Sequence, residues 1–124
     1  MSPTITPYFT VQDADRLIDF LIRTFDGVLV RENRYADGRM QHARVQIGDS
    51  LLMINSSTEN YPANISQMHI VVADADAVYD GALRQGATSI MEPNDRPHGE
   101  RMAGLTDPCG NIWWIASQLP SSSA

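Results

Sequence analysis

An internal repeat limits the folds open to this chain more than any other feature of its sequence. The segment Val11-Gln12-Asp13-Ala14-Asp15 returns as Val72-Ala73-Asp74-Ala75-Asp76. Each copy follows a short apolar segment and opens an amphipathic stretch that ends near a glycine, Gly27 in the first half and Gly86 in the second. Because such spaced self-similarity marks a duplicated supersecondary unit, the sequence predicts two copies of one small module.

Hydrophobic periodicity gives the elements of each module. In the first half it predicts a strand over 5–11, a helix over 13–25 and strands over 28–35, 40–47 and 51–55. In the second half it predicts a strand over 67–73, a helix over 74–85 and strands over 87–91, 102–106 and 112–117, with a polar loop over 92–101. The chain is therefore expected to be an α+β protein with two βαβββ modules in tandem, over residues 4–56 and 66–118.

Length and charge narrow the class of protein. At 124 residues the chain fits one domain, which we place at 1–119 with a disordered tail over 120–124. Acidic residues outnumber basic ones by 15 to 9, so a phosphate backbone would be repelled and nucleic acid is an unsuitable partner. No apolar run is long enough for a membrane span, no secretory leader is visible, and the single cysteine, Cys109, suits a reducing compartment. We expect a cytoplasmic protein with no membrane partner.

Strand alternation predicts which side chains face away from the helices. Ile5 is expected to lie under the first helix, and Met40 to share a face with His42. The face opposite the helices is expected to present aromatic, cationic and amide groups: Tyr8, His42, Arg44, Met53, Asn55, Gln67, His69 and Trp114. Such a lining is typical of a site for a flat, partly polar ligand. A solvated face, or one covered by a second copy of the chain, has the same composition and remains an alternative.

Three features of this face suggest roles. Of the adjacent Trp113 and Trp114, alternation sends the first to the core and the second to the open face, where its indole is a stacking surface or a plug. His69 is a candidate ligand contact, general base or structural residue. His42 and Arg44 together suit an anionic or carbonyl-bearing ligand, unless Arg44 pairs with a nearby acid.

Four segments, in this order and spacing, resemble the vicinal oxygen chelate superfamily, which includes glyoxalase I, bleomycin-resistance proteins and extradiol dioxygenases. They are Ile5-Thr6-Pro7-Tyr8, Ala36-Asp37-Gly38-Arg39, Ile47-Gly48-Asp49-Ser50-Leu51-Leu52-Met53 and Asp107-Pro108-Cys109-Gly110-Asn111-Ile112-Trp113. The likeness is to the small single-domain, bleomycin-resistance-like branch. It implies modules that close a U-shaped cup and pair within a homodimer, either within one chain or swapped between the two chains.

The resemblance also implies where a metal would sit. Members with a metal place four histidine or glutamate ligands at points that fall here on Thr6, Met53, Gln67 and Trp114. None of these suits a divalent cation, which prefers imidazole or carboxylate. We therefore expect no metal, no cofactor and no catalytic residue.

The function that follows is capture of a planar or aromatic small molecule, of the antibiotic- or natural-product-resistance type. The alternative is a metal-dependent lyase, isomerase or dioxygenase with other ligands, for which His42 and His69 are the candidates. A structural or regulatory dimer with plugged cups is a third possibility.

Overall fold

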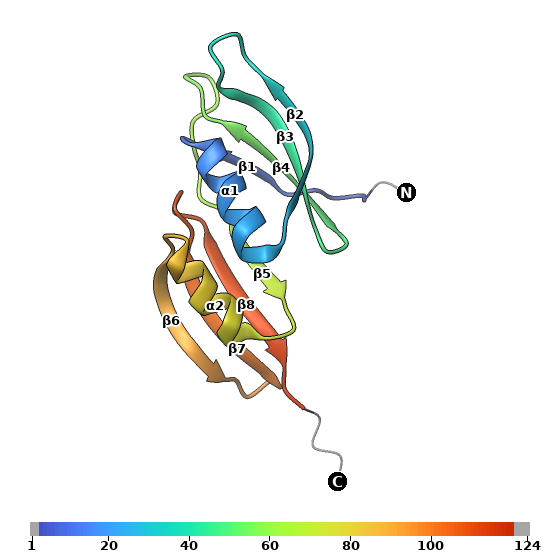
Figure 1. Ribbon diagram of the computed structural model, residues 1–124, viewed down its shortest axis with the longest axis vertical. Coiled ribbons are helices and arrows are strands. Elements are labelled where there is room, and N and C mark those ends of the chain that lie inside the picture. Colours follow the sequence, from blue (N-terminus) through green and yellow to red (C-terminus); the bar gives the residue numbers. More distant parts are fainter. Residues whose placement is uncertain (1–2, 121–124) are drawn as a thin grey trace. The chain divides into compact units, whose positions relative to one another are not determined.

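The computed structural model describes residues 3–120 (Figure 1). The chain divides into two compact units, with the boundary in the sequence between Ser66 and Gln67. Each unit has the order βαβββ, with one helix and one four-stranded sheet, so the predicted α+β class and duplicated module are confirmed. Apart from Pro120, the predicted tail over 120–124 lies outside the described residues. Among the helices of the described chain, none is long and apolar enough to cross a bilayer.

The first unit is a helix packed on a mixed sheet. Its elements are β1 (Tyr8–Val11), α1 (Ala14–Phe25), β2 (Val28–Arg34), β3 (Met40–Ile47) and β4 (Ser50–Ser56). The strand order is β1-β4-β3-β2, with β1 parallel to β4 and the other pairs antiparallel. Helix α1 lies across one face of this sheet (Figure 1), so each strand has a helix-covered face and an opposite, open face within the unit.

Helix α1 begins and ends through its own capping residues. The Asp13 side chain accepts a hydrogen bond from the Arg16 backbone N–H, which satisfies a donor left free at the helix start. At the other end Asp26, not Gly27, takes the left-handed conformation (φ 57°) and donates its N–H to Leu21. Gly27 is needed for space, because a Cβ there would lie 3.0 Å from Val45 Cγ1 and 3.1 Å from the Leu21 carbonyl oxygen.

The apolar core of this unit joins α1 to the strands beneath it. Leu17, Phe20 and Leu21 on the helix are fully buried, as are Phe9 on β1 and Ile54 on β4. The helix residues among them, at positions 17, 20 and 21, have the i, i+3, i+4 spacing of one face of an amphipathic helix.

Two placements in the first unit were predicted wrongly. Strand β1 begins at Tyr8 rather than Ile5, and Ile5 is 85% exposed instead of buried under α1. Met40 is fully buried and does not share the face of His42. The register moves from Asn33–His42 to Arg34–Met40, so β3 carries one extra residue, a β-bulge that turns Met40 toward the helix-covered side.

The second unit repeats the same topology. Its elements are β5 (Gln67–Val71), α2 (Ala75–Arg84), β6 (Thr88–Asp95), β7 (Glu100–Thr106) and β8 (Ile112–Gln118). The strand order is β5-β8-β7-β6, with β5 parallel to β8. Asp74 caps α2 by accepting from the Ala77 N–H, as its repeat partner Asp13 does in α1.

The predicted polar loop over 92–101 is largely strand. β6 continues to Asp95, and β7 starts at Glu100, so only residues 96–99 connect them. The register with β7 is irregular between Met91 and Asn94, which lets Pro93 lie within β6 although it has no N–H to donate. This longer hairpin brings Met91 and Arg96 to a site described below.

One carboxylate, Asp107, organises the β7–β8 turn and ties it to the core. Its Oδ1 accepts hydrogen bonds from the backbone N–H groups of Cys109 and Asn111, at 2.8 and 3.1 Å. Its Oδ2 accepts from the Trp113 indole N–H at 2.8 Å. Trp113 is 2% exposed, which confirms its predicted place in the core.

Candidate functional site

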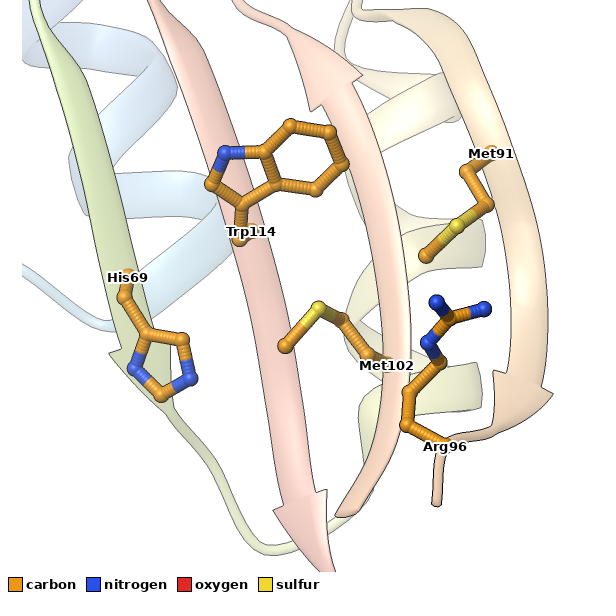
Figure 2. A pocket seen from close by; sticks show the side chains of 5 residues that line it. All are labelled: His69, Met91, Arg96, Met102 and Trp114. Atoms are coloured by element: carbon orange, nitrogen blue, oxygen red, sulfur yellow. The ribbon is translucent and has the colours of Figure 1, made fainter. Parts of the chain in front are cut away.

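The open face of the second unit contains a shallow cavity of about 380 Å³ that is largely open to solvent. It is lined by His69 from β5, Trp114 from β8, Met102 from β7, Met91 from β6 and Arg96 from the following turn (Figure 2). Of these residues, the sequence predicted His69 and Trp114 as site residues. A volume of this size lies in the range that small-molecule sites occupy.

The Trp114 indole lies directly against the backbone of Gly104, its register partner on β7. A Cβ at Gly104 would lie 2.4 Å from Cζ3 and 2.7 Å from Cε3 of the indole, so no other residue leaves room for the ring in this position. The sequence could have indicated this contact, because Gly104 is an isolated glycine inside a predicted strand, and such a glycine often marks a close approach of another group to the backbone.

A hydrogen bond fixes the other edge of the same ring. The Trp114 Nε1–H donates to Gln67 Oε1 at 2.5 Å. The indole is thus oriented by β5 on one side and rests on β7 on the other, and it is only partly exposed. An aromatic ring held this way can stack on a flat molecule without first losing rotational freedom.

Beside the indole, two histidines share one carboxylate. His98 Nε2 lies 2.7 Å from Glu100 Oε1, and His69 Nε2 lies 3.3 Å from Glu100 Oε2. The hydrogen bond from His98, with a smaller contribution from His69, holds the Glu100 pKa below its ordinary value. His69 is thereby supported by a neighbouring carboxylate while its ring still lines the cavity (Figure 2).

Sequence reasoning missed the two thioethers and the cation of this cavity. Met91 and Met102 provide flexible, polarisable walls that suit aromatic surfaces. Arg96 donates from Nη1 to Asn94 Oδ1 at 3.0 Å, which fixes one edge of its guanidinium. Arg96 was missed because the sequence placed the end of β6 at residue 91 rather than 95, whereas Met91 and Met102 lay inside predicted strands and were not assigned to the open face.

The first unit brings Tyr8, His42 and Arg44 together on its own open face. Tyr8 Oη lies 2.9 Å from His42 Nδ1, and Arg44 Nε donates to His42 Nε2 at 3.2 Å. Because Arg44 can only donate, Nε2 is the acceptor and the proton of a neutral His42 is assigned to Nδ1. Desolvation, assisted by Arg44 and Arg31, lowers the His42 pKa and keeps the ring neutral. Burial, with Tyr35 nearby, raises the Tyr8 pKa and keeps the phenol protonated.

Met53 and Asn55 lie on β4, next to the hydrogen-bonded residues Tyr8, His42 and Arg44. Met53 is the register partner of both Tyr8 and Arg44, and Asn55 is that of Thr10. The Asn55 Oδ1 atom is buried and accepts no hydrogen bond in the structure. Five of the eight predicted site residues are therefore on the first unit (Tyr8, His42, Arg44, Met53 and Asn55) and three on the second (Gln67, His69 and Trp114).

Two repeated βαβββ units, each with a helix on one sheet face and ligand-type side chains on the other, define a protein of paired modules with the vicinal oxygen chelate fold. The chain belongs to the Glyoxalase/Bleomycin resistance protein/Dioxygenase superfamily, whose family model matches residues 4–115.

Two solved structures and one curated protein illustrate what this chain is similar to. TioX from Micromonospora sp. ML1 is similar in structure, with a TM-score of 0.80 and 24% identity over 95% of this chain and 100% of that one. The fosfomycin resistance protein FosX from Mesorhizobium loti has a TM-score of 0.68 and 18% identity over 94% and 92% of the two chains. An uncharacterized protein of Mycobacterium bovis, Mb0911c, is 29% identical over 96% of this chain and 86% of its own length.

The residues at the four positions that the family resemblance assigns to metal ligands do not suit a divalent cation. Gln67 and Trp114 are hydrogen-bonded to each other, and an indole N–H cannot ligate. Met53 offers a soft thioether, and Thr6, which precedes β1, offers only a neutral hydroxyl. Within residues 3–120, no three or more His, Cys, Asp or Glu side chains form a group that could hold a metal.

Proposed function

We propose that this protein is a metal-independent small-molecule-binding protein that holds a planar, aromatic ligand against the Trp114 indole. The observation that carries the proposal is the way in which that ring is held in place. Gly104 gives it room, and Gln67 fixes its edge, so the aromatic surface is oriented before any ligand arrives.

The other groups around the cavity support the same ligand class. Met91 and Met102 add apolar, polarisable contact, while Arg96 and His69 provide polar groups at its border. This combination suits a flat ring system with a few polar substituents. We further propose that Tyr8, His42, Arg44, Met53 and Asn55 form ligand contacts on the open face of the first unit.

The proposed biological role is capture of an antibiotic or natural product by a cytoplasmic homodimer. The family name includes bleomycin resistance, and FosX is described as a fosfomycin resistance protein. Light scattering of the purified chain measures the oligomeric state, and a dimer is the expected result.

Fluorescence of single-tryptophan variants tests ligand capture, because Trp113 and Trp114 are the two tryptophans of the chain. In Trp113→Phe the emission reports Trp114, and acridine or flavone should quench it saturably. In Trp114→Phe the buried Trp113 remains, and the same compounds should cause little change. Calorimetry should show weaker binding to Trp114→Phe than to Trp113→Phe. The proposal is wrong if a panel of planar aromatics neither binds nor quenches.

The competing class is a metal-dependent lyase, isomerase or dioxygenase. Metal analysis of the purified protein separates it from a binding protein. A stoichiometric zinc, nickel or iron ion that is lost in His69→Ala would favour the enzyme and count against the proposal.

A further inference from the structure

Two arginines face each other across neighbouring strands of the first unit. Arg31 on β2 is the register partner of Arg44 on β3, and Arg44 is in turn the partner of Met53. Glu32 and Arg34, on the same strand, form an ion pair with each other. Arg34 also reaches Asp15 at the start of α1, so this pair lies on the face of the sheet that α1 covers. Arg31 therefore projects from the opposite face of β2, the open face that carries Arg44 and His42.

Like charges directly opposite each other destabilise a sheet unless something offsets them. Two other arginines of this unit have carboxylate partners, Asp19 for Arg23 at 2.9 Å and Asp15 for Arg34 at 2.7 Å, and Arg39 donates to the Ser57 carbonyl oxygen. Among residues 3–120, neither Arg31 nor Arg44 has a carboxylate oxygen within 4.0 Å. The side chain of Arg44 makes one hydrogen bond, from Nε to His42.

The hydrogen bonds among Tyr8, His42 and Arg44 leave several N–H and O–H donors of these residues without a partner in the described part of the chain. Arg44 Nε–H occupies His42 Nε2, and the His42 Nδ1–H then donates to Tyr8 Oη. The Tyr8 O–H, both Nη groups of Arg44 and the whole guanidinium of Arg31 remain available to donate. A cluster with two positive charges and surplus donors is complementary to an oxyanion.

We propose that Arg31, Arg44 and Tyr8 form an oxyanion-binding site for the carboxylate or phosphate group of a small molecule. The guanidinium groups supply charge and paired N–H donors, and the Tyr8 hydroxyl supplies a neutral donor. Neutral His42 is hydrogen-bonded to both Arg44 and Tyr8 and thereby orients these two side chains. This inference uses residues of the first unit and does not depend on the aromatic-ligand proposal for the second.

NMR titration of the His42 ring tests the site on the full chain, with benzoate and inorganic phosphate as separate probes. Ionic strength is held constant with chloride, so that general screening does not change. A bound anion offsets the two guanidinium charges, and the apparent pKa of His42 should rise saturably. We expect half-saturation at about 1 mM or below for the preferred probe.

Matched variants locate the response. Arg31→Gln and Arg44→Gln should each weaken binding at least about tenfold, as loss of a charge-assisted contact would. Arg23→Gln is the control, because it removes the same charge from an arginine that already has a carboxylate partner. It should leave the affinity unchanged. Backbone amide spectra of all three variants confirm that each is folded.

Each remaining outcome has a defined meaning. Saturable binding of either anion supports the site, and the tighter probe identifies carboxylate or phosphate as the preferred group. No saturable response to either anion overturns the proposal, as does an equal response to neutral benzamide or an equal loss in Arg23→Gln. Because both tryptophans belong to the second unit, failure here is distinguishable from failure of the fluorescence test.

Discussion

Substitution of Gly104 by alanine tests the packing of the Trp114 indole against the backbone of β7. The added Cβ would lie 2.4 Å from Cζ3 of the ring, well inside van der Waals contact, so the ring has to move or the strands have to separate. Gly104 does not have a positive φ, and its backbone therefore accepts alanine without conformational strain. The cost is steric, and overpacking of this kind destabilises by about 1–3 kcal/mol.

Urea denaturation followed by circular dichroism measures the effect. A loss of about 2 kcal/mol, with a slope near 2 kcal/mol per molar urea, lowers the midpoint by about 1 M. Displacement of the indole should also shift its fluorescence emission and break its hydrogen bond to Gln67.

Two comparisons make the reasoning refutable. Gly81→Ala is the matched control, because Gly81 lies in α2 and a Cβ there would meet only Arg84 Nη2 at 3.9 Å. It should stabilise the protein by about 0.5–1 kcal/mol, since alanine favours helix over glycine. In a Trp114→Ala background the cost of Gly104→Ala should nearly vanish. An unchanged midpoint and emission for Gly104→Ala would show that the indole does not rest on this glycine.

Three further predictions concern stability. Trp113→Phe leaves an Asp107 oxygen without its indole donor and should cost about 1–3 kcal/mol in urea denaturation; full stability would show that the bond is not needed. Because the folded-state pKa of His42 is lowered, its contribution to stability is complete above about pH 6.5 and lost as pH falls through the folded value. The unfolding free energy should decline below that pH, less so in His42→Gln. Asp15→Asn removes the exposed ion pair with Arg34, which lowers the Asp15 pKa, and should cost under about 1 kcal/mol by thermal melting; a larger loss would show that exposure does not weaken this pair.

The sequence was sufficient for the modules and for the sheet face on which several predicted site residues lie. The repeat and the helical stripes predicted both βαβββ units, and alternation placed Tyr8, His42 and Arg44 on one face, where hydrogen bonds join them. These predictions succeeded because they rest on periods that local backbone geometry sets.

The failures arose where pairing between strands overrides the local pattern. The bulge opposite Asn33 and Arg34 reverses the face of Met40, and no single-strand alternation contains that extra residue. The β6 strand continues past Pro93 because its hairpin partner β7 supports it, although the segment is polar. Arg96 enters the cavity through this extension, so it could not be found from periodicity alone.

The Asp107 carboxylate also sets a practical limit on engineering of this scaffold. Loop grafting usually treats a hairpin tip as a free attachment point. Here the Asp107 side chain accepts hydrogen bonds both from the backbone of the tip and from the buried Trp113 indole. A longer graft that moved this residue would leave an indole without its acceptor inside the second module. Designers should therefore keep residues 107–111 as they are and look for insertion points in the segment between the two modules.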